Sequence, residues 1–269
     1  MGTSNLFKGK ILRQTSGNAA LYPSWICDLY SPQLLIQQYK NNICGEIPLK
    51  KCLKDRTNAI AIFKRELLAN VDELRKVGIL FGTTVEPMDP DRTLELTLEA
   101  VKIALSNGVP VQIRTNLIDW AYSEKWETLC ATKKLDFKKI AIGLVKHLGA
   151  ESWTRTYYVR IAMEKCREMG CRIFAEIDVN DDLMENFEQI MHNLFPYCDY
   201  FVVGLLCGCK KSNKKSLAAI VYKWNNILDK VCKKIHWKKC IVDSLGNDFI
   251  FCAGSCVDAD YNIFVQHST

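Results

Sequence analysis

The sequence contains no long hydrophobic run. Its longest mostly apolar stretch, Phe201–Cys209, is far shorter than the roughly 20 residues that a membrane-spanning helix needs. The first 20 residues also lack the apolar core of a secretory signal peptide. We therefore expect a soluble, cytoplasmic protein that has no membrane partner.

The sequence also lacks the short motifs of several common enzyme classes. None of its 13 cysteines form a CxxC pair, which argues against zinc ribbons and redox dithiols. The four histidines never occur at ligand-like spacing, and neither a nucleophile elbow nor a glycine-rich phosphate loop is present. We expect most of the cysteines to be buried free thiols and predict no conventional metal site.

Positive charge is concentrated in one segment. Residues 210–239 contain ten lysines and a single acid, Asp229, whereas the rest of the chain carries a small negative charge. A lysine-rich segment can lie along a phosphate backbone, but it is more often a solvated helix face. The candidates for contact with nucleic acid are Lys210, Lys211, Lys214, Lys215, Lys233 and Lys234.

Short apolar runs recur at nearly regular intervals. An early run covers Ser24–Tyr30, and the later runs begin 30, 31, 32 and 28 residues apart, which is the spacing of βα units. The later predicted strands are Ile79–Gly82, Val109–Ile113, Ile140–Leu144, Arg172–Ile177 and Tyr200–Leu205.

Helical patterns separate these predicted strands. We expect helices over Arg56–Val77, Thr93–Ser106, Thr154–Met169, Leu183–Leu194 and Lys214–Ile235, several of them ending at glycine or asparagine. Alternating strands and helices predict parallel strands joined by right-handed crossovers. The predicted fold is α/β, a parallel (β/α)6-type partial TIM-like barrel over residues 22–239, with an N-terminal extension over 1–21 and a small β-rich addition over 240–269.

Active sites of such barrels lie where the strands end and the βα loops begin. Each polar residue there is, taken singly, more often a helix cap or a loop contact than a ligand. As a set, however, they predict a polar pocket at the barrel mouth. The residues at these ends are Glu86, Arg114, Asn116, Lys146, His147, Glu176, Asp178, Cys207 and Cys209.

Several of these segments resemble a known enzyme family. The pattern Tyr22-Pro23-x-x-x-Cys27-Asp28-Leu29-Tyr30 is followed by Pro48–Cys52 and by Gly82-Thr83-Thr84-Val85-Glu86-Pro87. Together with Val109–Thr115 and Ala175–Asp178, this resembles the spore photoproduct lyase-like branch of the radical S-adenosylmethionine (SAM) superfamily. The resemblance covers roughly residues 10–210 and implies a barrel that binds SAM.

The resemblance also implies three cysteines that hold a [4Fe-4S] cluster in the loop after the first strand. In this sequence the corresponding register falls on Gln33, Gln37 and Lys40. Amide and ammonium groups cannot replace soft thiolates on iron. The cluster motif is therefore lost, unless Cys27, Cys44 and Cys52, or the pair Cys207 and Cys209, form an atypical site.

Three functions follow from these observations. The favoured one is a noncatalytic, cluster-less relative that binds SAM, a nucleoside or nucleic acid, using Arg114 or Asn116 for a carboxylate or ribose and Glu86, Glu176 or Asp178 for an amino group or hydroxyl. The first alternative is an active radical SAM enzyme with an atypical [4Fe-4S] site. The second is a cluster-free enzyme that uses acid-base catalysis by Glu176 with Asp178 or His147.

Overall fold

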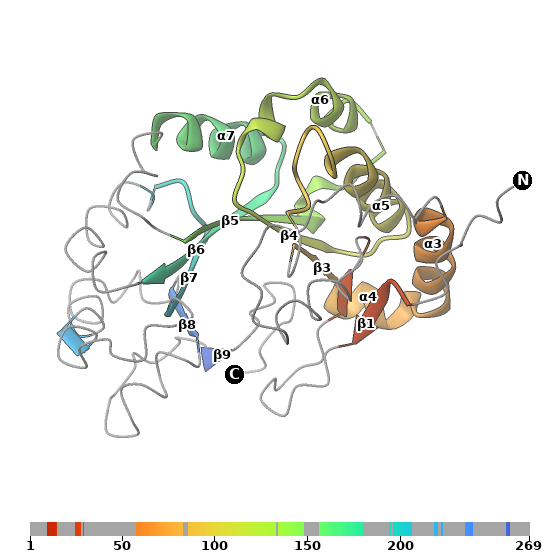
Figure 1. Ribbon diagram of the computed structural model, residues 1–269, viewed down its shortest axis with the longest axis horizontal. Coiled ribbons are helices and arrows are strands. Elements are labelled where there is room, and N and C mark those ends of the chain that lie inside the picture. Colours follow the sequence, from red (N-terminus) through yellow and green to blue (C-terminus); the bar gives the residue numbers. More distant parts are fainter. Residues whose placement is uncertain are drawn as a thin grey trace, which may run out of the picture. The chain divides into compact units, whose positions relative to one another are not determined.

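The computed structural model describes residues 10–14, 25–27, 29, 58–82, 86–132, 134–147, 156–179, 194, 196–205, 218–219, 222, 235–238 and 257–258 (Figure 1). These residues form an α/β fold whose strands pair mostly in parallel. The chain divides into two compact units, one with strands β1 to β4 and one with strands β5 to β9.

The first unit contains a short sheet of four strands. Strand β2 (Trp25–Cys27) pairs in parallel with β3 (Ile79–Phe81), and β3 pairs in parallel with β4 (Val111–Thr115). On the other side of β2 lies β1 (Leu12–Gln14), which is antiparallel. Strand β1 belongs to the segment that we expected to be an extension, and its pairing makes it part of the sheet.

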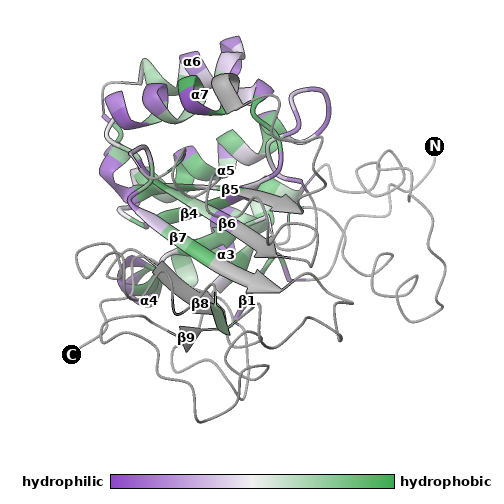
Figure 2. Ribbon diagram, turned by 90° about the vertical axis from the view of Figure 1, so that its left-hand side faces the viewer, coloured by the Kyte–Doolittle hydropathy of each residue, from purple (hydrophilic) through white to green (hydrophobic). Residues whose placement is uncertain are grey.

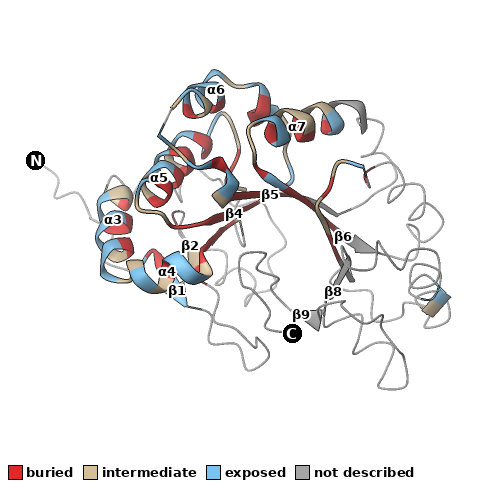
Figure 3. Ribbon diagram, turned by 180° about the vertical axis from the view of Figure 1, so that it is seen from behind, coloured by how far each residue is buried: buried red, intermediate tan, exposed pale blue. Residues whose placement is uncertain are grey.

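Helices of the first unit bury one face each. Helix α3 (Ala59–Ala69) contacts α5 (Leu94–Ser106), and α5 also contacts β4 and α6 (Glu124–Cys130). Figure 3 shows buried and exposed residues alternating along α5 and α6, as expected for amphipathic helices at the surface. The buried side chains join the helices to the sheet, with the Phe63 and Phe81 rings 6.3 Å apart between centroids.

A second aromatic pair fixes the segment after β4. The 3-10 helix η1 (Asp119–Tyr122) brings Trp120 against Trp126 of α6, with ring centroids 4.9 Å apart in an edge-to-face arrangement. Helix α6 begins at Ser123, whose hydroxyl accepts a hydrogen bond from the Trp126 N–H. A second 3-10 helix, η2 (Phe137–Lys139), leads into β5.

The second unit is built on a parallel sheet. Its strands are β5 (Ile140–His147), β6 (Arg172–Val179), β7 (Tyr200–Leu205), β8 (Ile235–Lys238) and β9 (Val257–Asp258), each paired in parallel with the next. Figure 2 shows the described part of β7 as hydrophobic. Helix α7 (Thr156–Glu168) contacts β6 and buries Val159, Met163 and Cys166.

Contacts at the amino ends of β6 and β7 hold these strands in register. The Asp199 carboxylate accepts a hydrogen bond from the Ile173 N–H at 2.8 Å, and the Asp199 N–H donates to the Ile173 carbonyl at 2.7 Å. Further along, the Phe174 ring lies over Gly143 of β5, where an added Cβ would collide with the ring. The pairing of β5 with β6 therefore depends on a glycine at position 143.

Most predicted elements are present, with shifted ends. Strand β7 has the predicted bounds, and α5 and α7 end at Ser106 and Glu168, next to the predicted stop signals. The single predicted helix over Arg56–Val77 is wrong, because α3 ends at Ala69, α4 (Val71–Val77) begins at Val71, and Asn70 separates them. The Asn70 side chain donates to the Glu66 carbonyl at 2.8 Å and competes with the helical hydrogen bonds.

The observed ends of β5 and β6 differ from the predicted ends, and β8 was not predicted as a strand. Strand β5 continues to His147 and β6 to Val179, so that Lys146, His147 and Asp178 lie within strands and not after them. Strand β8 begins at Ile235, where we expected the final helix to end; Ala218, Ala219 and Tyr222 of that segment are helical. The predicted helix over Leu183–Leu194 lies almost wholly outside the described residues.

The α/β class and the parallel pairing are confirmed. No hydrogen-bonded pairing among the described strands closes the sheet into a ring, and the (β/α)6-type partial barrel remains a prediction. The three predicted chain divisions also remain predictions; β9 is the described part of the expected C-terminal addition. No helix within the described part of the chain is long and apolar enough to cross a membrane.

Candidate functional site

In the first unit, the segment after β3 is organised around the Glu86 carboxylate. Its Oε1 accepts hydrogen bonds from the Thr115 hydroxyl at 2.5 Å and the Met88 N–H at 3.0 Å, and its Oε2 accepts one from the Asn116 N–H at 2.8 Å. A carboxylate has about four acceptor positions, and three are used by protein donors. Glu86 therefore joins the segment after β3 to the end of β4.

The same segment is also reinforced through its backbone. The Thr93 hydroxyl donates to the Glu86 carbonyl at 2.8 Å and accepts from the Asp89 N–H at 3.0 Å. Gly82, at the end of β3, has a φ of +88°, and an added Cβ would collide with the Arg114 carbonyl of β4. Gly82 thus allows the ends of β3 and β4 to lie close together, and the buried Thr93 hydroxyl ties the segment after β3 to the start of α5.

Of the three predicted site residues of this unit, Glu86 and Asn116 are joined by a hydrogen bond, and Arg114 lies on β4 two residues before Asn116. Arg114 is half-buried on β4, and Asn116 directly follows β4 and is exposed. The Glu86 carboxylate, however, is already bound by three donors of the protein, which is the structural role of a loop residue. Because three donors of the protein already bind the Glu86 carboxylate, few of its acceptor positions remain for a ligand.

In the second unit, Glu176 is a charged residue in the interior of a strand. It lies on β6 with 2% of its surface exposed, and its register partners are Val145 of β5 and Val202 of β7. Burying a carboxylate costs free energy unless it is hydrogen-bonded, paired with a charge or bound to a metal. Glu176 makes at least one such interaction within the protein.

Other polar residues share the sheet face of Glu176. Alternate residues of a strand lie on the same face, so Asp178 shares the face of Glu176. The register places His147 of β5 directly opposite Asp178, whereas Lys146 is on the other face. Three of the predicted residues, His147, Glu176 and Asp178, are therefore brought together by β5 and β6 at the carboxyl ends of these strands.

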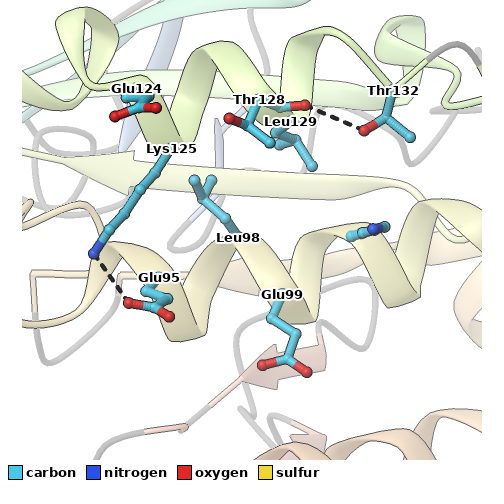
Figure 4. Close-up of a pocket in the computed structure, with 9 residues that line it drawn as sticks. Glu95, Leu98, Glu99, Glu124, Lys125, Thr128, Leu129 and Thr132 are labelled. Atoms are coloured by element: carbon cyan, nitrogen blue, oxygen red, sulfur yellow. Dashed lines mark hydrogen bonds and ion pairs between the residues drawn. The ribbon is translucent and has the colours of Figure 1, made fainter.

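Sequence reasoning did not identify the groove between α5 and α6, shown in Figure 4. It has a volume of about 580 Å³ and includes the apolar Leu98 and Leu129. Lys125 Nζ lies 3.0 Å from Glu95 Oε2, but both side chains are largely exposed, and such pairs contribute little free energy. None of the predicted site residues lines this groove, which we interpret as a surface depression.

Among the described side chains, no group of three or more His, Cys, Asp or Glu residues is arranged to hold a metal ion. Cys27 is buried on β2, and burial, together with the nearby Glu127, raises the pKa of Cys130 to about 11. Since metals bind the thiolate, Cys130 is a poor ligand at neutral pH.

Several predicted residues lie outside the described residues. These are the degenerate cluster positions Gln33, Gln37 and Lys40, the cysteines Cys44, Cys52, Cys207 and Cys209, and the nucleic-acid candidates Lys210, Lys211, Lys214, Lys215, Lys233 and Lys234. The loss of the cluster motif and the binding of nucleic acid therefore stay predictions.

This chain has only low similarity to the known proteins with which it was compared. No protein-family profile and no curated protein matches the chain. Two solved structures of SuiB from Streptococcus suis are similar, one at 14% identity with a TM-score of 0.42 and one, bound to S-adenosylmethionine, at 16% identity with a TM-score of 0.40. Each match covers 65% of this chain and 42% of the SuiB chain, so this chain matches less than half of SuiB's length. These similarities do not assign the chain to a family.

Proposed function

We propose that this protein binds a small polar ligand at the carboxyl ends of β5 and β6, and that it does so without an iron-sulfur cluster. The observation that carries the proposal is the buried carboxylate of Glu176 within a parallel strand. Asp178 follows on the same face, and this edge of a parallel sheet is where α/β proteins bind their ligands. Two carboxylates suit a ligand that carries an amino group or hydroxyls.

SAM is the first ligand to test. The resemblance of Cys27–Tyr30, Gly82–Pro87 and Ala175–Asp178 to the radical SAM superfamily supports this choice, since the family binds SAM in its barrel. SAM carries an ammonium group, a sulfonium group and ribose hydroxyls, all of which interact favourably with carboxylates. The residues at Gln33, Gln37 and Lys40 support binding without radical chemistry.

Titration calorimetry with SAM tests this proposal. Glu176→Gln keeps the shape of the side chain but removes its charge, and we expect SAM binding to weaken by about tenfold or more, which corresponds to one charge-assisted contact. Glu168→Gln is the matched control, because Glu168 is an exposed carboxylate at the end of α7 and should leave binding unchanged. Absence of SAM binding by the unmodified protein, or equal affinity of both variants, would overturn the proposal.

Iron analysis tests the active radical SAM alternative. After anaerobic reconstitution with iron and sulfide, a cluster-less protein should show no absorbance near the roughly 400 nm expected of thiolate-bound clusters. Binding of about four irons per chain would instead show an intact cluster site. Substituting Cys27, Cys44, Cys52, Cys207 and Cys209 one at a time would then identify the ligands.

A cluster-free acid-base enzyme is the second candidate. The observation in its favour is the register that sets His147 opposite Asp178, since an imidazole beside a carboxylate can transfer protons near neutral pH. Incubation with SAM, followed by chromatography, would reveal a product that forms with the unmodified protein and is lost in His147→Ala. If no product forms, SAM is only bound.

We also propose that the lysine-rich segment 210–239 binds nucleic acid. Its ten lysines support this, because ammonium groups that replace counterions give an affinity that falls steeply with salt. Replacing Lys210, Lys211, Lys214, Lys215, Lys233 and Lys234 by glutamine should weaken binding to single-stranded RNA and reduce its salt dependence. Unchanged affinity in this variant would mean that the segment is a solvated surface.

A further inference from the structure

Two basic side chains meet at the carboxyl end of α5 in the first unit. Arg75 of α4 donates from Nε to the Asn107 carbonyl at 2.9 Å, and Lys139 of η2 donates from Nζ to the Gly108 carbonyl at 3.1 Å. These contacts span 32 and 31 residues of the chain. The fold therefore brings a guanidinium and an ammonium group to one loop.

Gly108 leaves an open point between these two cations. Its φ is +76°, a conformation that glycine adopts readily. A Cβ at this position would lie 3.6 Å from Arg75 Nε and 3.6 Å from Lys139 Nζ. No other described atom lies within 4 Å of that point, apart from Gly108 itself and its chain neighbours. An anionic oxygen near this point would face both nitrogens.

Both cations keep hydrogen-bond donors for a ligand. A guanidinium has five N–H donors and an ammonium has three, and each group uses one of them on a carbonyl of the loop. Because these carbonyls already hold the two side chains in place, a ligand has to order them less when it binds.

Two negative charges near the cations oppose an anionic ligand. The carboxyl end of a helix carries about half a negative charge. The Asp72 carboxylate lies 3.4 Å from Arg75 Nη1, but it is 91% exposed, and such surface pairs contribute little free energy. The two full positive charges of Arg75 and Lys139 exceed these opposing charges, so the loop favours an anion.

We propose that Arg75 and Lys139 bind a phosphate group beside Gly108. Arginine and lysine both bind phosphate through charge-assisted hydrogen bonds, arginine through its planar fork and lysine as a point charge. The proposal goes beyond the functions proposed above, because it involves neither the carboxyl ends of β5 and β6 nor the segment 210–239.

Inorganic phosphate is the first probe, and the amide signal of Gly108 in a two-dimensional ¹⁵N–¹H NMR spectrum of the full-length protein is the readout. We expect this signal to shift with phosphate and to stay in place with chloride at the same ionic strength. Arg75→Gln and Lys139→Gln should each weaken phosphate binding by about tenfold or more, since each removes a charge-assisted contact.

Asp72→Asn gives a test of opposite sign. It removes the carboxylate that competes for Arg75, so phosphate should bind more tightly, by up to about fivefold. Lys64→Gln is the matched control, because Lys64 is an exposed cation on α3, and it should leave the affinity unchanged. An unshifted Gly108 signal, or equal affinity in all four variants, would overturn the site.

Single-stranded RNA is the second probe, and it identifies the source of the phosphate. If RNA shifts the Gly108 signal even after Lys210, Lys211, Lys214, Lys215, Lys233 and Lys234 are replaced by glutamine, the site binds a nucleic-acid backbone independently of the segment 210–239. If only inorganic phosphate shifts the signal, the site takes free phosphate or a small phosphorylated molecule. If RNA binds the unmodified protein but neither probe shifts Gly108, the segment 210–239 binds nucleic acid and the phosphate site is wrong.

Discussion

Substitution of Glu86 tests whether its carboxylate holds the end of β3 to the end of β4. Glu86→Ala removes three acceptor contacts, to the Thr115 hydroxyl, the Met88 N–H and the Asn116 N–H. A hydrogen bond to a charged group contributes about 1.5–3 kcal/mol, and a buried donor left without a partner costs about 1–3 kcal/mol. The three contacts do not all count equally, because their surroundings differ.

Met88 is fully buried, so its N–H loses an acceptor that water cannot easily replace. The Thr115 hydroxyl has an alternative acceptor, the Leu117 carbonyl at 3.3 Å, and Asn116 is exposed to solvent. We therefore expect Glu86→Ala to lower the free energy of unfolding by about 2 kcal/mol. Glu86→Gln keeps one acceptor oxygen and should lower it by about 1 kcal/mol.

Urea unfolding measures these changes, and Glu99→Ala is the control. Glu99 is an exposed carboxylate on α5, and its removal should change stability by less than about 0.5 kcal/mol. Hydrogen exchange over residues 86–93 and 115–118 should become faster in Glu86→Ala and stay unchanged in Glu99→Ala. Equal stability and equal exchange in the two variants would refute the role assigned to Glu86.

Three further predictions concern other contacts. Glu66→Ala removes the carboxylate oxygen that accepts both N–H groups at the start of β1, so exchange over residues 11–14 should become faster and stability should fall by about 1–3 kcal/mol. Gly143→Ala drives a methyl group into the Phe174 ring and should cost about 1–3 kcal/mol, with part of the loss recovered by Phe174→Leu in a double-mutant cycle. Cys130 should be alkylated slowly at pH 8, because burial and Glu127 raise its pKa to about 11.

The pH dependence of Cys130 has a definite sign. The folded thiol keeps its proton above the ordinary value of 9.0, so unfolding releases a proton between pH 9.0 and about 11. Its contribution to stability is therefore fully present below pH 9.0 and is lost as the pH rises toward 11. Alkylation is followed peptide by peptide, with Glu127→Gln expected to speed the reaction. Rapid alkylation of Cys130 at pH 8 would contradict this prediction. Unchanged exchange in Glu66→Ala would contradict the role of Glu66, and full stability in Gly143→Ala would contradict the requirement for glycine at position 143.

Local patterns were sufficient to predict most strands of the fold. The apolar runs at Ile79, Ile140, Arg172 and Tyr200 each begin a strand in the structure, because a continuous apolar run is stable only when it is buried on both faces of a parallel sheet. Strand β1 has one buried residue in three and gives no such pattern. It exists because it pairs with β2 and because Glu66 accepts its first N–H groups.

The sequence identified candidate site residues but could not show how they are arranged in space. Strand ends identified Glu86, Glu176 and Asp178 as polar residues in functional places, but the same reasoning could not assign them different roles. The Glu86 carboxylate accepts hydrogen bonds from the Thr115 hydroxyl and the Asn116 N–H, about 30 residues away in the chain. Glu176 is buried between valines of two other strands.

The order of strands and helices is thus encoded locally, because hydrophobic periodicity and helix stop signals act over a few residues. The pairing of His147 with Asp178, the burial of Glu176 and the occupation of Glu86 were decided only in three dimensions. Each of these depends on strand register. Register is fixed by contacts between segments that are some 30 residues apart, and it cannot be predicted from the sequence of either segment alone.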